Sequence, residues 1–243
     1  MMKTVAFIQA RMSSTRYPGK VLTDLAGIPM ILFMIQRVKR ARMIDKVILV
    51  TSTDPSDEAL ADSVRKAGEP VFRGSLEDVL DRFASAAQKY PAQNYVRLTG
   101  DCPLSDPELI DSIIDLHLRS RADYTCNTNP PTYPDGLDVE VFTAKTLSDA
   151  AKSALRPSER EHVTAWMYDS KNGLHCENFV GSFDASHMRL TIDYPDDVDA
   201  VRRIISAFEE PISADYFDIL RVIGNDPSIT LINQHARNEN FLN

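Results

Sequence analysis

Residues 5–20 of the chain have the sequence VAFIQARMSSTRYPGK, in which an apolar, β-branched run ends abruptly in a polar loop. The run predicts a short buried strand, and the loop follows its carboxyl end. Up to residue 119, further strand-like segments follow, and they alternate with amphipathic segments of helical period. The predicted strands are Val5–Ala10, Lys46–Thr51, Val71–Arg73 and Asn94–Thr99, and the predicted helices are Pro29–Arg42, Ser56–Ala67, one beginning at Ser75, and Asp106–Arg119. Such alternation predicts right-handed βαβ crossovers and an α/β fold whose mostly parallel sheet is flanked by helices.

The pattern changes after about Tyr124. Residues 127–136 form a loop rich in Asn, Pro and Thr, and the alternating segment Leu137–Phe142 predicts a strand. The remaining predictions are helices at Ala144–Ala154 and Ser158–Ser170, a strand pair at His175–Phe183 and Met188–Ile192, a helix at Pro195–Phe208, and one more helix within Ser213–Asn243. We interpret residues 1–243 as a single domain with a small inserted lobe at about 127–179.

The composition limits the classes of partner. The 243 residues include 27 Lys and Arg against 35 Asp and Glu, which gives a net charge of −8. Nucleic acids and anionic membrane surfaces require a positive field, so we expect neither as a partner, whereas a small anionic ligand held by a local cluster of cations is compatible. The three cysteines have no CxxC spacing, which disfavours a disulfide framework and a zinc site. No signal-peptide pattern or bilayer-length apolar run is present, and we expect a cytoplasmic protein.

The loop after the first predicted strand has the residue types that bind a polyphosphate. It carries three fixed positive charges, Arg11, Arg16 and Lys20, together with hydroxyl side chains and Gly19. Guanidinium forks, an ammonium and backbone amides are the groups that contact phosphate oxygens. The spacing does not match the GxxxxGK[ST] pattern of a P-loop. A solvated surface loop with ordinary charges is the simpler alternative, and we favour the binding role.

Two predicted strands end in an aspartate. Asp101 follows one strand in the sequence LTGDCPL, and Asp193 follows another in LTIDYPDD. Ligands of open α/β sheets bind beyond the carboxyl ends of strands, where two such carboxylates would meet and share a hard cation such as Mg²⁺. The alternative is helix capping, but Asp106 and the pair Asp196 and Asp197 are better placed for it. Cys102 we interpret as a small packing residue.

The predicted lobe also contains several acidic residues. In the sequence DGLDVEVF, Asp138 and Glu140 share one face of an alternating segment that begins with Asp135. These carboxylates would bind sugar hydroxyls or an ammonium, or they would form a solvent-facing edge. Glu161 and His162 lie near a helix start, where their charges by themselves indicate only a solvated face.

Six ordered motifs carry a resemblance to a known family. They are FIQARMSSTRYPGKVL (7–22), VFRGSLEDVLDRF (71–83), RLTGDCPL (97–104), DGLDVEVF (135–142), EREHVT (159–164) and RLTIDYPDD (189–197). Together they resemble the CTP-using nucleotidyltransferases that activate acidic sugars, such as the acylneuraminate and 3-deoxy-manno-octulosonate cytidylyltransferases. The resemblance is closest to the spore coat polysaccharide biosynthesis protein F group. The chain departs from the sugar-acid enzymes at Gln9, where those usually have Pro, and in its Gly-Asp-Cys-Pro loop.

The resemblance implies a Rossmann-like nucleotide-diphospho-sugar transferase fold and a role for each motif. It implies nucleotide binding by Ala10, Arg11, Ser14, Arg16, Lys20, Arg73 and Gly100. It implies Mg²⁺ binding by Asp101 and Asp193, and catalysis by Arg16, Lys20 and Asp101. It raises Asp135, Asp138, Glu140, Glu161 and His162 to candidates for binding the acceptor, and it implies a homodimer formed through the lobe.

The leading hypothesis is therefore a Mg²⁺-dependent enzyme that transfers CMP from CTP, or another nucleoside triphosphate, to a small anionic acceptor for a surface glycan. A glycosyltransferase that uses a nucleotide sugar is the second hypothesis, but such enzymes usually lack the loop 11–20. A catalytically silent binding protein is the third. It predicts loss of Lys20, Asp101 or Asp193, and all three are present.

Overall fold

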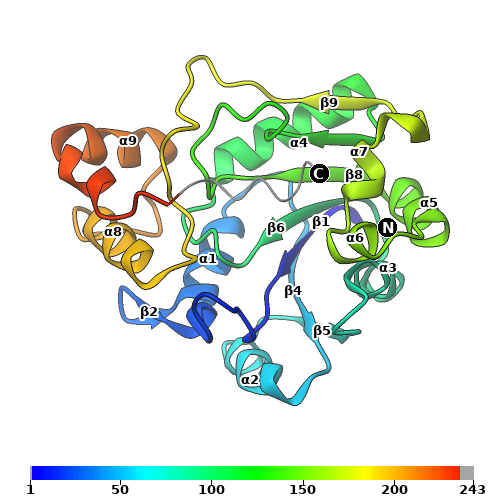
Figure 1. Cartoon of the computed structure of the whole chain (residues 1–243), viewed down its shortest axis with the longest axis horizontal. Coiled ribbons are helices and arrows are strands. Elements are labelled where there is room, and N and C mark those ends of the chain that lie inside the picture. The colour runs from blue at the N-terminus through cyan, green and yellow to red at the C-terminus, as the bar shows by residue number, and fades with distance from the viewer. Residues whose placement is uncertain (1, 236–243) are drawn as a thin grey trace.

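The structure is a computed structural model, and it describes residues 2–235. Its centre is a seven-stranded sheet with the strand order β5-β4-β1-β6-β8-β7-β9 (Figure 1). The strands of this sheet are β1 (Met2–Gln9), β4 (Lys46–Ser52), β5 (Val71–Gly74), β6 (Ala92–Thr99), β7 (Tyr124–Cys126), β8 (Glu140–Thr143) and β9 (Cys176–Asn178). A separate antiparallel pair joins β2 (Asp24–Leu25) to β3 (Ile28–Pro29).

Helices follow most of the strands. They are α1 (Met30–Val38), α2 (Glu58–Lys66), α3 (Val79–Lys89), α4 (Pro107–Ser120), α5 (Ala144–Ser153), α6 (Pro157–Glu161), α7 (Ala165–Tyr168), α8 (Pro195–Ile205) and α9 (Tyr216–Asn225). Within residues 2–235, every helix is too short or too polar to cross a lipid bilayer.

The pairing of the strands confirms the predicted α/β class. Strands β5, β4, β1 and β6 are mutually parallel, as βαβ crossovers require. Strand β8 runs antiparallel to both β6 and β7, and β9 is parallel to β7. Residues 124–178 thus extend one edge of the same sheet.

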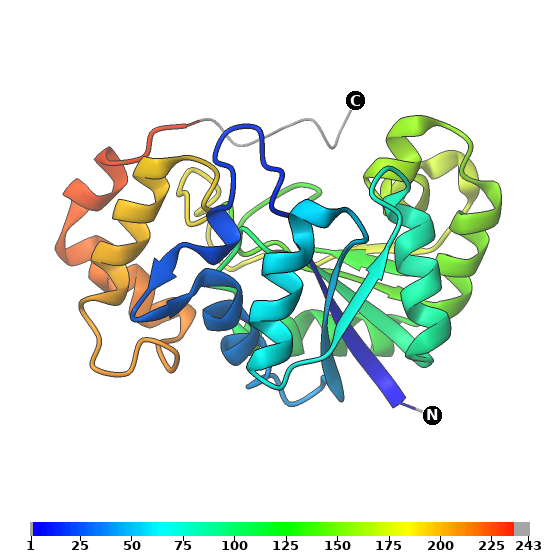
Figure 2. The ribbon, with the colours of Figure 1, turned by 90° about the horizontal axis from the view of Figure 1, so that it is seen from below.

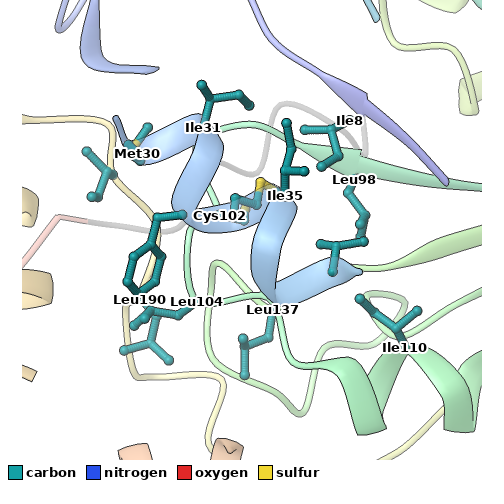
Figure 3. Close-up of a cluster of buried hydrophobic side chains, with 14 of the residues drawn as sticks. Ile8, Met30, Ile31, Ile35, Leu98, Cys102, Leu104, Ile110, Leu137 and Leu190 are labelled. Carbon is teal, nitrogen blue, oxygen red and sulfur yellow. The ribbon is translucent and has the colours of Figure 1, made fainter. Parts of the chain in front are cut away.

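Both faces of the sheet are buried, which explains the nearly continuous apolar runs of its strands. Along β1, Ala6 and Ile8 point to one core, and Val5 and Phe7 point to the other. Helices α1, α2 and α4 cover the first face and α3 and α5 the second, while α8 and α9 extend the first layer to one end of the molecule (Figure 2). Figure 3 shows part of the first core, where side chains of β1, α1, β6 and α4 meet Leu137 and Leu190.

The strand predicted at Leu137–Phe142 is shifted in the structure. Only Glu140–Thr143 forms β8, because the backbone before it is paired with a side chain and not with a strand. The Asn127 amide donates to the Leu137 carbonyl and accepts from the Val139 N–H, both at 2.9 Å. The predicted alternation of burial persists, and Leu137 and Val139 are buried while Asp138 is half-buried.

The helix predicted at Ser158–Ser170 is divided into α6 and α7. The break lies at Val163, whose φ of 54° is in the left-handed region that β-branched residues avoid. An amphipathic period gives no sign of such a break. The residues on either side of the break, His162 and Thr164, lie at the cavity described below.

Of the strand pair predicted at His175–Phe183 and Met188–Ile192, the first strand is confirmed in part, whereas the second strand and the pairing are wrong. Strand β9 is confined to Cys176–Asn178 and pairs with β7, which the sequence did not predict. The second segment forms a single bridge in which Arg189 lies opposite Asp135. Here the Leu190 N–H donates to the Asp135 carbonyl over 2.6 Å, and the Ile192 N–H donates to the Asp101 carbonyl over 2.8 Å. These contacts bring the segment beside β6 without extending the sheet.

Candidate active site

A cavity of about 540 Å³ opens between the carboxyl ends of β1 and β6 and residues 124–168. The parallel pairing of β1 with β6 brings the loops that follow them to one edge of the sheet. The lining contains every residue assigned above to a site except Arg73: Ala10, Arg11, Ser14, Arg16, Lys20, Gly100, Asp101, Asp135, Asp138, Glu140, Glu161, His162 and Asp193.

The loop after β1 is shaped by its own backbone and by one buried carboxylate. Gly19 has a φ of 75°, and its N–H donates to the Met12 carbonyl over 2.9 Å. Asp57, which is fully buried, accepts a 2.6 Å hydrogen bond from the Met12 N–H and further bonds from Ser52. Sequence reasoning missed Asp57, because nothing near it in the chain distinguishes it from an ordinary acid at a helix start.

Gly100 allows the ends of β1 and β6 to approach closely. Its N–H donates to the Gln9 carbonyl over 2.8 Å. A Cβ added at Gly100 would lie 2.7 Å from the Ala10 Cβ, which is closer than carbon atoms can pack. The glycine therefore sets the spacing of the strand ends beneath the cavity.

Lys20 joins the two strand-end aspartates. Its Nζ lies 3.0 Å from Asp101 Oδ2, 2.8 Å from Asp193 Oδ1 and 2.8 Å from the Ile192 carbonyl. Three acceptors satisfy the three donors of the ammonium group. Burial favours a lower pKa for Lys20, but the two carboxylates outweigh it and raise the pKa above its ordinary value. Lys20 is therefore charged, and it neutralises a carboxylate pair that would otherwise repel.

Asp193 has two further cationic neighbours. The Arg16 guanidinium lies 2.8 Å from Asp193 Oδ1, and Arg189 approaches Oδ2 at 3.4 Å. Burial works against ionisation, yet Lys20 and Arg16 lower the pKa of Asp193 to about 2. The carboxylate is ionised at neutral pH and has the charge that a cation requires.

Arg189 organises this corner of the cavity, and sequence reasoning did not single it out. Its side chain is 6% exposed and contacts Asp135 at 2.9 Å and Asp197 at 2.8 Å, besides Asp193. Asp197 in turn accepts the N–H groups of Asp193 and Tyr194 at the start of α8. Asp135, a candidate acceptor ligand, is thus ion-paired to the protein, and Arg189 fixes three carboxylates around the strand end.

The lobe side of the cavity has a hydrogen-bonded centre at Glu140. One oxygen of Glu140 accepts from the Tyr124 hydroxyl at 2.7 Å and the Thr164 hydroxyl at 2.6 Å. The other oxygen forms an ion pair with Arg97, which also donates to the Gln9 side chain at 3.0 Å. Both oxygens of Glu140 are therefore engaged by the protein, and Arg97 is a cavity residue that the sequence did not reveal.

Glu161 differs from Glu140 in its surroundings. Glu161 ends α6 and is exposed, and its side chain forms no ion pair or hydrogen bond with any residue in the 2–235 range. His162 and Asp138 line the same cavity. These three side chains are polar members of the lobe's lining of the cavity.

Arg73 does not line the cavity, and the nucleotide-binding role expected of it stays a prediction. Its guanidinium donates to the Ser52 and Asp54 carbonyls at 2.7 and 2.9 Å and forms an ion pair with Glu58. These partners hold the turns after β4 and β5. Arg82 of α3 lines the cavity instead.

Cys102 is a packing residue, as expected. It is 4% exposed within the core that includes Leu104 and Ile110 (Figure 3). Burial raises the pKa of the Cys102 thiol well above its usual range, and the nearby Asp101 charge acts in the same direction. A neutral thiol is a poor nucleophile.

The carboxylates of the cavity do not make a complete metal site by themselves. Over the part of the chain that the structure describes, no group of three or more His, Cys, Asp or Glu side chains could hold a metal ion. Mg²⁺ prefers one or two carboxylates with the remaining positions filled by water and phosphate oxygens. The pair Asp101 and Asp193 fits that requirement when a phosphate is present.

Comparison with known proteins identifies the family. The family model described as cytidylyltransferase matches residues 5–216. The chain belongs to the cytidylyltransferase family. The spore coat polysaccharide biosynthesis protein SpsF of Bacillus subtilis is 33% identical over 228 residues, which cover 90% of this chain and 93% of that protein.

Solved structures agree with this assignment. A cytidylyltransferase from Leptospira borgpetersenii superposes with a TM-score of 0.91 at 33% identity, over 98% of this chain and 100% of the other. A CMP:2-keto-3-deoxy-manno-octonic acid synthetase complexed with CTP superposes with a TM-score of 0.66 at 19% identity, over 84% and 99% of the two chains. The second likeness shows a shared fold. This member of the cytidylyltransferase family is a nucleotidyltransferase enzyme.

Proposed function

We propose that the enzyme transfers CMP from CTP to an acidic sugar or phosphorylated acceptor, with Mg²⁺, and that pyrophosphate leaves. The observation that carries the proposal is the Lys20 ammonium held between Asp101 and Asp193, next to the cationic loop 11–20. The related SpsF is named for polysaccharide biosynthesis, and the synthetase of the same fold was solved with CTP. These relationships support a role in making a surface glycan precursor.

Arg11, Arg16 and Lys20 would bind the triphosphate. In the reaction an acceptor oxygen forms a bond to the α-phosphorus as the bond from the α-phosphorus to the bridging oxygen breaks. Negative charge then accumulates on the departing pyrophosphate. Cations that are already in position in a partly enclosed cavity stabilise that charge without having to move, as solvent would. Most of the catalysis is therefore electrostatic.

Asp101 and Asp193 would hold Mg²⁺ together with phosphate oxygens. When bound, the ion supplies charge neutralisation at the phosphates. Arg189 keeps Asp193 oriented through its contacts with Asp135 and Asp197, so the carboxylate is placed before the substrate arrives.

The acceptor would lie on the lobe side, against Glu161, His162 and Asp138. Glu140 supports this surface through Arg97, Tyr124 and Thr164. An acceptor whose reacting oxygen is already anionic needs no general base. We further propose a cytoplasmic homodimer with the lobe 127–179 at the interface, which light scattering of the purified protein would test.

Thermal stabilisation tests the nucleotide assignment. CTP, UTP, GTP, ATP and dTTP are each added with and without Mg²⁺, and a ligand at a hundredfold excess over its Kd stabilises the fold by roughly 2.7 kcal/mol. A Mg²⁺-dependent effect of CTP supports the proposal and leads to a pyrophosphate-release screen of acidic sugars and phosphates. A response to a nucleotide sugar, with none to any triphosphate, would overturn it in favour of glycosyl transfer.

A further inference from the structure

The C-terminal segment, residues 233–235, lies against the turn that follows the strand-end carboxylate Asp193. The ring of His235 stacks on the ring of Tyr194, with the two ring centres 3.9 Å apart and the planes 23° from parallel. The Nε2 of His235 lies 3.0 and 2.9 Å from the two carboxylate oxygens of Asp196. A stacking contact and a hydrogen bond therefore fix the same imidazole beside the cavity.

Asn233 joins the C-terminal segment to the same turn at a second place. It is buried, and its amide donates to Asp197 Oδ1 over 2.9 Å. Asp197 is also the carboxylate that accepts the N–H groups of Asp193 and Tyr194. The position of His235 is thus set by a buried neighbour in the chain as well as by its own contacts.

Tyr194 in turn contacts an arginine of the loop 11–20. The guanidinium carbon of Arg16 lies 5.4 Å from the centre of the Tyr194 ring, which is within the range of a cation–π contact. The same guanidinium lies 2.8 Å from Asp193 Oδ1. An aromatic ring attracts a cation without occupying its N–H donors, so donors of Arg16 remain for phosphate oxygens.

Arg16 needs such support because its side chain is 36% exposed. A long, exposed side chain samples many rotamers, and ordering it on a ligand costs conformational entropy. Contacts that order the side chain before the ligand arrives reduce this cost and strengthen binding. The ring of Tyr194 does this only while it is itself held in place, and His235 stacks on that ring.

We propose, on the basis of the proposed triphosphate site, that His235 is a positioning residue for phosphate binding. By stacking on Tyr194 it holds the ring where the ring orders Arg16. The active site then includes a segment outside all six motifs of the sequence, the last of which ends at residue 197. A purely structural contact would instead stabilise the start of α8 and leave phosphate binding unchanged.

The test is a double-mutant cycle on the binding of inorganic tripolyphosphate, which has no base or sugar. Calorimetry with Mg²⁺ gives Kd values for the wild type, His235→Leu, Arg16→Met and the double variant. His235→Leu should bind at least roughly threefold more weakly than the wild type, and Arg16→Met more weakly still. In the Arg16→Met background, His235→Leu should have no further effect, because the side chain that it positions is absent.

Two further variants separate the stacking contact from the hydrogen bond. His235→Phe keeps a ring against Tyr194 without the contact to Asp196, and it should recover most of the affinity that His235→Leu loses. Tyr194→Leu removes the ring itself and should weaken tripolyphosphate binding at least as much as His235→Leu. Thermal unfolding of each preparation gives the Tm alongside the Kd.

His187→Leu is the matched control, because His187 is exposed and outside the cavity lining, and its Kd should equal that of the wild type. Equal losses from His235→Leu with and without Arg16 would show that the two side chains act independently, which overturns the proposal. A lowered Tm with a wild-type Kd in His235→Leu would overturn it in favour of a structural contact. If the wild-type protein binds neither tripolyphosphate nor CTP, the proposed function fails as well, and that result needs no variant.

Discussion

The ammonium of Lys20 donates a 2.8 Å hydrogen bond to the carboxylate of Asp193, although 173 residues separate them in the chain. The same ammonium also contacts Asp101, so a single cation lies between the two carboxylates. A divalent ion bound by both carboxylates would compete with this cation. When a triphosphate is bound, its oxygens offer Lys20 an alternative partner.

We therefore expect metal binding to depend on nucleotide. The wild-type protein should bind Mn²⁺, a spectroscopic substitute for Mg²⁺, at least roughly tenfold more weakly without CTP than with it. Lys20→Met should bind Mn²⁺ without nucleotide, because its carboxylate pair has lost the ammonium. Electron paramagnetic resonance of free Mn²⁺ measures both affinities. Lys145→Met on exposed α5 is the control, and equal nucleotide-free affinities of wild type and Lys20→Met would contradict this explanation.

Asp101→Asn should reduce pyrophosphate release by on the order of 10²-fold or more. The side chain lies at a strand end, where Asn fills nearly the same volume and leaves no core cavity. The Tm should therefore change little. Turnover and thermal unfolding of the same preparation check this, and wild-type turnover in the variant would refute the assigned role.

Glu140 and Glu161 were both expected to bind the acceptor, and their surroundings predict different mutational effects. Glu140→Gln disturbs the hydrogen bonds with Arg97, Tyr124 and Thr164 and should lower the free energy of unfolding by about 1–3 kcal/mol. Glu161→Gln should stay within about 0.5 kcal/mol of wild type. Urea unfolding measures both values, and equal stability of the two variants would show that the contacts of Glu140 contribute little.

Gly136→Ala should be strongly destabilising. Its φ is 105°, and an added Cβ would lie 2.4 Å from the Thr191 nitrogen, in the segment that leads to Asp193. We expect a loss of about 2–4 kcal/mol in the free energy of unfolding. At Gly224 in α9 an added Cβ would meet no atom within 4 Å. Gly224→Ala should therefore raise the free energy of unfolding by about 0.5–1 kcal/mol. A neutral effect at Gly136 would mean that the two segments are not in contact.

His117 should make stability depend on pH. Burial lowers the pKa of His117 from its ordinary value of 6.5 to about 4, with its ring hydrogen-bonded to Thr125. The unfolded chain therefore binds a proton near pH 6.5, whereas the folded chain does so only near pH 4. The free energy of unfolding should decrease by about 3 kcal/mol as the pH falls through this range.

Denaturation at a series of pH values checks the effect of His117. The decrease should be absent in His117→Gln and retained in His187→Gln, since His187 is exposed. A decrease that persists in His117→Gln would assign the dependence to other groups.

The sequence by itself determined the class of fold and the chemical types of the cavity residues. Amphipathic helical periods and short continuous apolar runs are local properties, and the buried parallel strand Lys46–Ser52 shows such a run clearly. The same local patterns predicted that Asp101 follows one strand and that Arg11 to Lys20 follow another. The motifs also carried the resemblance to the family that the comparisons show.

The tertiary structure decided which of these residues meet and which others join them. The Asn127 amide replaces a strand partner and shifts β8, and the left-handed Val163 divides a helix. Arg73 donates hydrogen bonds to the turns around it. Arg82 lines the cavity, and Arg189 forms ion pairs with carboxylates beside it, although nothing in the local sequence distinguishes either arginine. Such contacts join residues far apart in the chain, and their energies depend on burial and on three-dimensional partners that no local pattern records.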